Sequence, residues 1–207
     1  PHNKNLNKIM DMFVWKSVVV SLIEKIISVT KKLKYEKQSD AINEVLIYGG
    51  DMEERKKQVG LNNLFCILYI IANAGRTIDI SIPSLESDSI TKCLIDVKRK
   101  NNVEIRLVVH NDEDSCNLQY LADHGIDVKV IKSKVQLEHE FILIDGTTSC
   151  DAVAILGSLD FEVNRVNCCR DTTILSSEYA LISALQCEFN RVWNSAQVPD
   201  SNSGEWN

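Results

Sequence analysis

The stretch Leu137-Glu-His-Glu-Phe-Ile-Leu-Ile-Asp-Gly146 decides how the fold is assigned. We predict a strand over residues 138–144, because four successive apolar side chains at its end are typical of a strand inside a sheet. The Asp-Gly pair that follows is typical of a turn. Further strands are predicted at 152–156 and 172–175. No long helix separates the first two of these three strands, which indicates an antiparallel part of the sheet.

Upstream of this stretch, the hydrophobic pattern alternates between the two periods of strand and helix. Strands are predicted at 45–48, 77–83, 103–109 and 126–131, and helices at 62–74, 88–100, 115–124 and 177–193. This alternation predicts an α/β fold, a mixed sheet flanked by helices. We divide the chain into an N-terminal anchor-like helix and linker, a folded domain and a disordered tail, with the bounds 1–43, 44–195 and 196–207.

Charge and cysteine content exclude some classes of protein. The 207 residues carry a net charge of −6, whereas a protein that binds nucleic acid on its own is usually basic. An apolar fraction of 44% argues against disorder over most of the chain. The seven cysteines show no C-x-x-C spacing, so we expect reduced thiols in a cytosolic compartment, no zinc site and no cofactor.

The segment Met12–Lys34 combines many apolar residues with scattered lysines. Its longest charge-free run, Ser17–Ile23, is far shorter than the ~20 residues that span a bilayer. An apolar helix followed by lysines is typical of an anchor that lies at a membrane surface. A helix that packs on its own domain or on a partner has the same pattern, so both interpretations stay open.

Four motifs together resemble one family. They are the stretch 137–146, the run Ile155-Leu-Gly-Ser-Leu-Asp-Phe161, the pair Arg170-Asp171 and the helix end Glu188-Phe-Asn-Arg-Val-Trp193. These motifs resemble the phospholipase D superfamily, above all its single-motif mitochondrial branch of the Zucchini or mitochondrial cardiolipin hydrolase type. The resemblance covers residues 44–195. It implies a phospholipase D-like fold with one motif copy per chain, the cytosolic face of the outer mitochondrial membrane, and the piRNA pathway with its proteins as partners.

The family positions in this chain are Glu138, Glu140, Asp145, Gly157, Ser158, Asp160 and Asp171. By resemblance, the catalytic histidine falls on Glu138 and the catalytic lysine on Glu140, with His139 between them. The asparagine of the family's second motif falls on Asp160. Of the His-Lys-Asp set, only Asp145 is retained, and the cysteines of the family's zinc finger are missing. The resemblance therefore implies no complete catalytic set and no phosphate-binding residues in this chain.

In the family, the histidine attacks phosphorus, a partner's histidine protonates the leaving oxygen, and the lysines hold the phosphate charge. Glu138 and Glu140 are two residues apart, so on a strand both would point to the same face, as the family's histidine and lysine do, but with negative charge. His139 would point to the opposite face. At about 4 Å and an effective dielectric constant near 20, such a reversal turns about 4 kcal/mol of attraction into repulsion. We therefore predict a pseudoenzyme that acts as a dimerising or scaffold protein. The alternative is an active phosphodiesterase, an endoribonuclease for single-stranded RNA or a cardiolipin hydrolase, that uses His139 or an outside nucleophile.

A single-motif chain of this family builds its site across a two-fold axis, so a homodimer would bring together Glu138, Glu140, Asp160 and Asp171 twice. Like charges in one cleft destabilise it. Relief would come from Arg170, from a cation such as Ca²⁺ on the two glutamates, or from pairing with an active homologue instead of a second copy. The two glutamates are weak candidates for metal ligands.

Simpler interpretations stay open as well. The two glutamates could be drifted residues without a role, Gly157-Ser158 could persist for a tight turn, and Asp145 could only end a strand. A third functional class is a lipid- or RNA-binding module. An acid-lined cleft disfavours phosphate ligands and direct nucleic-acid binding there, although the basic patch near Lys31 could touch anionic lipid.

Overall fold

The computed structural model describes residues 41–48, 54–85, 87–110, 115–147, 151–157 and 171–196, except for the side chains of 54–58 and 115–117. The compact unit begins at Ala41. The expectations for Met12–Lys34, for the family positions Ser158 and Asp160 with Arg170, and for the tail from residue 197 lie outside the described residues.

The described residues form one seven-stranded mixed sheet with the strand order β1-β7-β6-β5-β2-β3-β4. The strands are β1 (Asn43–Ile47), β2 (Thr77–Ser81), β3 (Glu104–His110), β4 (Asp127–Ile131), β5 (Phe141–Ile144), β6 (Val153–Leu156) and β7 (Thr172–Ser176). The helices are α2 (Glu54–Ala72), α3 (Asp88–Asn101), α4 (Ser115–Asp123) and α5 (Tyr179–Ser195). Strands β2, β3 and β4 are parallel, and the other neighbours pair antiparallel, which confirms the predicted mixed sheet.

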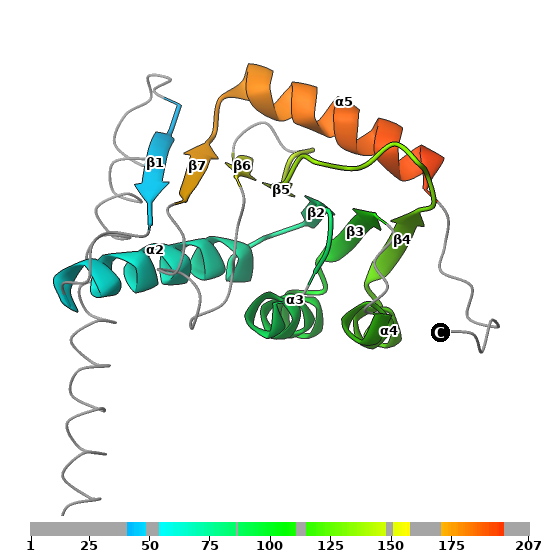
Figure 1. The fold of residues 1–207 in the computed structure, drawn as a ribbon, viewed down its shortest axis with the longest axis horizontal. Helices are drawn as coiled ribbons and strands as arrows, with labels where there is room; N and C mark the ends of the chain where they lie inside the picture. Colours follow the sequence, from blue (N-terminus) through cyan, green and yellow to red (C-terminus); the bar gives the residue numbers. More distant parts are fainter. Residues whose placement is uncertain are drawn as a thin grey trace, which may run out of the picture. The chain divides into compact units, whose positions relative to one another are not determined.

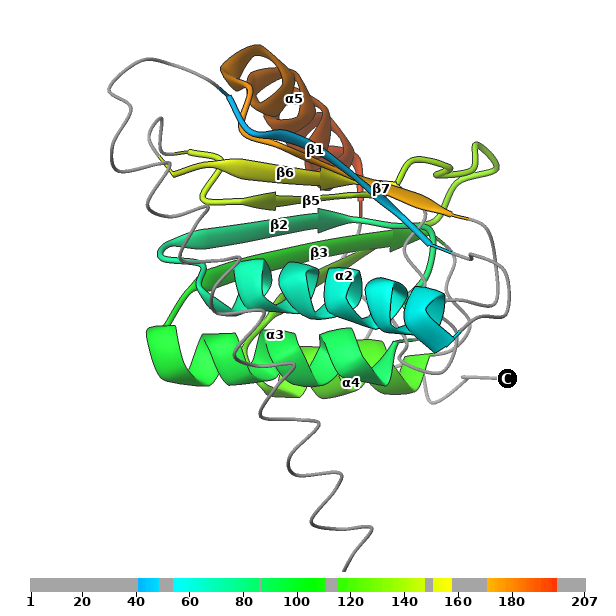
Figure 2. The ribbon, with the colours of Figure 1, turned by 90° about the vertical axis from the view of Figure 1, so that its left-hand side faces the viewer.

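The sheet separates two helical layers. Helices α2, α3 and α4 cover one face, and α5 crosses the other (Figures 1 and 2). Strand β5 lies in the middle and is buried on both sides. Its residues Ile142 and Ile144 join the hydrophobic core under α2–α4, whereas Phe141 and Leu143 join the core under α5. This two-sided burial is the physical reason for its unbroken apolar run.

Several predicted boundaries are wrong by two residues or more, including the starts of β5, β1 and α2. Strand β5 starts at Phe141 instead of residue 138, and β1 starts at Asn43, which we assigned to the linker. Asn43 belongs to the sheet because it pairs with Ser176, whose hydroxyl donates to the Asn43 side-chain oxygen at 2.7 Å. Helix α2 begins at Glu54, eight residues before the expected start at 62. Its first turns are charged and polar, so they lack the apolar period on which the prediction relied.

A buried ion pair joins the sheet to α5. The Asp79 side chain in β2 is almost fully buried and accepts two hydrogen bonds from the Arg106 guanidinium in β3, at 2.7 and 2.6 Å. The side-chain amide of Gln186 in α5 donates to the same carboxylate at 2.7 Å. The guanidinium also lies 4.9 Å from the ring centre of Phe189. One charge pair therefore fixes where α5 rests on the sheet.

Replacing Arg106 by leucine is expected to lower the free energy of unfolding by about 3 kcal/mol, because it leaves the Asp79 carboxylate buried without its cation. Arg99→Leu is the matched control. Arg99 is 2.7 Å from Asp96, but both side chains are half or more exposed, so we expect a loss of no more than about 1 kcal/mol. Urea unfolding curves measure both values. Equal losses in the two variants would contradict the proposed role of the buried pair.

Candidate functional site

Three family positions meet at one edge of the sheet, where β5 and β7 begin and β6 ends. The backbone N–H of Gly157 donates to the carbonyl oxygen of Glu140 at 3.3 Å. A Cβ atom on Gly157 would lie 2.3 Å from the carbonyl oxygen of Thr172. Glu140, Gly157 and Asp171 are therefore neighbours through their backbones, and Glu138 precedes them on an exposed stretch.

Glu138, His139 and Glu140 lie before β5 and not within it, so the strand that we predicted for them is wrong. The pairing of β5 with β2 ends at Phe141 and Ser81, because the chain after Ser81 turns toward β3 and includes Pro83, which has no N–H to donate. The segment continues the strand's alternation nonetheless. His139 stacks on Phe141, with ring centres 5.3 Å apart, so it faces α5 as predicted.

His139 is held between the sheet and α5. Its Nε2 atom is 3.3 Å from the Ser81 hydroxyl and 4.0 Å from the Glu188 carboxylate. Burial lowers the pKa of the imidazole, which keeps the ring neutral at neutral pH. Ser81 is completely buried, and both neighbours contact the same ring nitrogen, so these three residues do not form a nucleophilic relay. The contacts with Ser81, Phe141 and Glu188 hold the ring on the α5 side.

Gly157 has a backbone conformation that other residues rarely adopt, with φ = 128°. A side chain there would also collide with the Thr172 carbonyl. This glycine is needed so that the end of β6 can approach the start of β7 closely. The geometry supports the simpler interpretation that this part of the Gly157-Ser158 motif serves a tight turn.

Asp145 lies at the opposite end of β5 from the other described family positions. Its buried carboxylate accepts hydrogen bonds from the backbone N–H groups of Gly75, Arg76 and Thr77 at 2.9, 2.7 and 2.9 Å. Asp145 thus ties the end of β5 to the start of β2. A four-residue strand separates it from Glu140.

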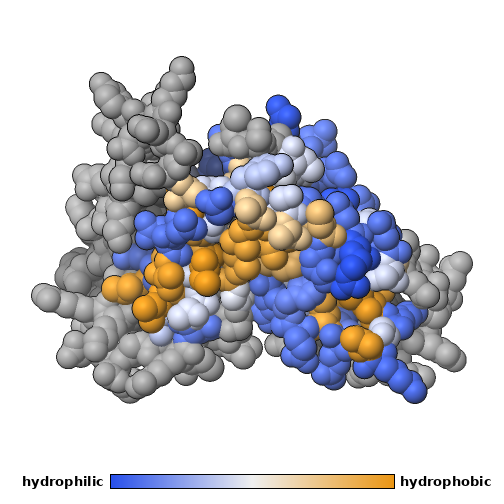
Figure 3. Space-filling view, turned by 90° about the horizontal axis from the view of Figure 1, so that it is seen from above, coloured by the Kyte–Doolittle hydropathy of each residue, from blue (hydrophilic) through white to orange (hydrophobic). Residues whose placement is uncertain are grey.

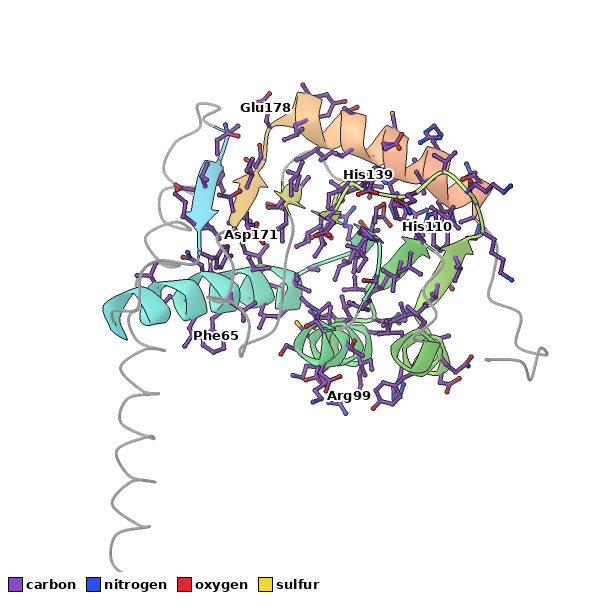
Figure 4. All side chains as sticks on the ribbon, viewed as in Figure 1. Phe65, Arg99, His110, His139, Asp171 and Glu178 are labelled. Carbon is purple, nitrogen blue, oxygen red and sulfur yellow. The ribbon has the colours of Figure 1, made fainter. Side chains whose placement is uncertain are left out.

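Asp171 faces the α2 side of the sheet (Figure 4). Its carboxylate accepts a hydrogen bond from the N–H of Thr172 at 2.6 Å. Burial raises the pKa of the nearby Tyr48 phenol, and the negative charge of Asp171 raises it further. Among the described residues, no group of three or more His, Cys, Asp or Glu side chains is placed to hold a metal ion. Glu138 and Glu140 therefore have no third ligand in this part of the chain.

His110, at the end of β3, was not expected to take part in the site. Its Nδ1 atom accepts a hydrogen bond from the backbone N–H of Leu137 at 3.1 Å, directly before Glu138. His110 therefore positions the segment that carries the two glutamates. No sequence signal marks this contact, because the two residues are 27 positions apart and belong to no shared motif.

Comparison with known proteins identifies the family. The family model described as "Cardiolipin synthase, PLD-like domain" matches residues 67–193, which is more than half of the chain. The chain belongs to the phospholipase D superfamily. Its curated relatives support the single-motif mitochondrial branch of this superfamily.

A mitochondrial cardiolipin hydrolase from Xenopus laevis is 24% identical over 130 residues, which cover 61% of this chain and 59% of that protein. One from Chlamydomonas reinhardtii is 24% identical over 130 residues, with 61% and 56% covered. The chain thus spans less than two thirds of the relatives' length. The phospholipase D family member Nuc from Salmonella typhimurium shares the fold, with a TM-score of 0.60, 15% identity, and 77% of this chain and 98% of that chain covered.

Gly157→Ala is expected to destabilise the fold by roughly 2–4 kcal/mol, since it combines backbone strain with a collision against the Thr172 carbonyl. Gly125→Ala is the control, because Gly125 also has a positive φ of 77° but its Cβ would lie 3.7 Å from the Lys98 side chain. We expect about 1 kcal/mol there, from strain alone. Thermal and urea unfolding measure both. A loss at Gly157 no larger than at Gly125 would show that the close approach is unimportant.

The lowered pKa of His139 predicts a dependence of stability on pH. The unfolded chain binds the proton more readily than the folded chain, so this contribution is complete above the ordinary value of 6.5 and declines as the pH falls through the folded pKa. In His139→Gln, the drop in unfolding free energy between about pH 7.5 and pH 5.5 should be smaller than in the parent chain. Parallel slopes in urea unfolding at the two pH values would rule this out.

Proposed function

We propose that this chain is a phospholipase D-like protein that does not hydrolyse phosphodiesters and that acts as a dimerising or scaffold partner. The observation that carries the proposal is the charge at the motif. Glu138 and Glu140 stand where the family's histidine and lysine belong, beside Gly157 and Asp171 at the same sheet edge. The one histidine between them is turned toward α5 and contacts Ser81.

The electrostatic argument concerns the phosphate as well as the nucleophile. A phosphate placed over Glu140 would meet a half-buried carboxylate, and the Asp171 carboxylate lies at the start of β7, two strands away. A carboxylate at about 4 Å repels a phosphate by about 4 kcal/mol at an effective dielectric constant near 20. The same edge would attract a partner that presents cations. An active homologue of the family would present such groups, so charge favours that pairing over a homodimer.

The outer face of α5 offers apolar area for a protein contact. Figure 3 looks onto this side of the molecule and shows a hydrophobic band next to hydrophilic surface. Exposed residues of α5 with hydrophobic side chains include Ala180, Ala184 and Cys187, and Tyr179 is 71% exposed at the start of the helix. This surface supports a role in binding a partner, and the main support for the proposal is the charge at the motif.

The place of action follows from the relatives. Because these relatives are named mitochondrial, we propose a mitochondrial location, at the cytosolic face of the outer membrane, with proteins of the piRNA pathway as partners. None of the helices that the structure describes combines the length and apolar composition that a bilayer crossing requires. The names of the relatives also favour the second candidate, a phosphodiesterase that cleaves cardiolipin, and the family resemblance adds single-stranded RNA as a candidate substrate.

A hydrolysis assay separates the two candidates. The purified chain is incubated with cardiolipin vesicles, single-stranded RNA and a phosphodiester reporter, and we expect no product above a buffer control. Hydrolysis that disappears in Glu138→Ala would establish the second candidate instead. Orthovanadate binding tests the charge argument, since Glu138→His/Glu140→Lys should bind it at least about tenfold more tightly than the parent chain. Glu104→His/Glu178→Lys, which makes the same exchange at two exposed sites elsewhere, should not.

Native mass spectrometry tests the partnership. Co-expression with an active homologue should give heterodimers in excess over homodimers of this chain, because opposite charges meet across the two-fold axis only in the mixed pair. The excess should shrink when the salt concentration rises. Homodimers of each chain without heterodimers would contradict the proposal.

A further inference from the structure

A pocket of about 390 Å³ lies on the α5 side of the sheet, and its lining includes Leu137 and His139, which flank Glu138 in the chain. One wall is the connection between β4 and β5, which runs back along α5 (Figure 1). The other wall is the last two turns of α5, including Arg191, Val192 and Ser195. This volume is within the range of pockets that hold small molecules.

The pocket combines an apolar base with cations at the rim. Leu137 and Val192 line it and are almost completely buried in the core under α5. Lys132 and Arg191 line it as well, and among the described lining residues the one carboxylate is that of Glu188. The Arg191 guanidinium is held by two hydrogen bonds to Glu188, at 2.7 and 2.6 Å, through Nε and Nη2. Its Nη1 atom makes neither of these bonds. The lining therefore carries net positive charge in a chain whose total is −6.

Two further residues shape the pocket. His139 lines it with a neutral ring that is fixed by Ser81 and Phe141, so it offers a preoriented polar edge without a charge. Val135 lines it from the connection and is 79% exposed, although it is a large hydrophobic residue in a polar segment. An exposed apolar side chain at the rim of a pocket is placed to contact a bound apolar group.

We propose that this pocket binds a small amphipathic anion, a phosphate or carboxylate joined to a short apolar group. The anionic group lies between Arg191 and Lys132, and the apolar group lies against Val135, Leu137 and Val192. Neither Glu138 nor Glu140 is among the described lining residues, so the site is distinct from the pair of glutamates on which the proposed function rests.

Isothermal titration calorimetry and amide chemical shifts test this on the full chain with hexyl phosphate, hexanoate, inorganic phosphate and hexyltrimethylammonium. We expect one of the two amphipathic anions to bind at least about tenfold more tightly than inorganic phosphate, with shifts at 131–139 and 188–195. Arg191→Gln and Lys132→Gln should each weaken that binding about tenfold, because each removes a charge-assisted contact. Val135→Ser should weaken the binding of the amphipathic anion and leave the affinity for inorganic phosphate unchanged.

The control is Arg99→Gln, which removes an exposed arginine of α3 outside the pocket and should leave binding unchanged. Three results would overturn the proposal. They are no binding of either amphipathic anion at millimolar concentration, equal binding of hexyltrimethylammonium, and unchanged affinity in both Arg191→Gln and Lys132→Gln. Arg191 is 70% exposed, so its replacement does not threaten the fold.

Discussion

The bidentate pair of Asp79 and Arg106 determines the geometry of one whole side of this molecule. It crosses from β2 to β3, takes a third hydrogen bond from Gln186, and places the arginine against Phe189. Because α5 is positioned by these contacts, so are the residues that face it. The surroundings of His139 and the pocket beside Arg191 both depend on a charge pair that touches neither of them. Buried pairs of this kind select one arrangement more than they add stability.

The ends of three strands meet beside the segment that carries the two glutamates. The hydrogen bond from Gly157 to Glu140 and the close approach of Gly157 to Thr172 bring the ends of three strands together. Side chains at such an edge project from a fixed frame, so an exchange of their charge does not require a change of fold. The Asp145 carboxylate accepts three hydrogen bonds from backbone N–H groups at the other end of β5.

The apolar run 141–144 and the alternating pattern upstream predicted the mixed sheet. The predicted helix 88–100 is present as α3, where the Ser87 hydroxyl accepts from the N–H of Ile90. Predictions from the hydrophobic pattern failed where a helix has no apolar period, as in the charged first turns of α2. They also failed for the exact start of β5, which depends on where β2 turns away. For the site, the sequence predicted which residues stand at the positions of the family motifs, but not the contacts that these residues make. The contacts of His110, Ser81 and Glu188 join residues far apart in sequence, and no local pattern encodes them.

The anchoring of Asp145 has a consequence for the order of folding. Its carboxylate joins residues 68 to 70 positions apart, and β5 must enter the sheet next to β2, after β3 and β4 in the chain. Closing so long a loop costs more entropy than pairing β2 with β3, so the parallel part is expected to assemble first. The contacts of Asp145 are therefore expected to form late, when the two halves of the sheet have met.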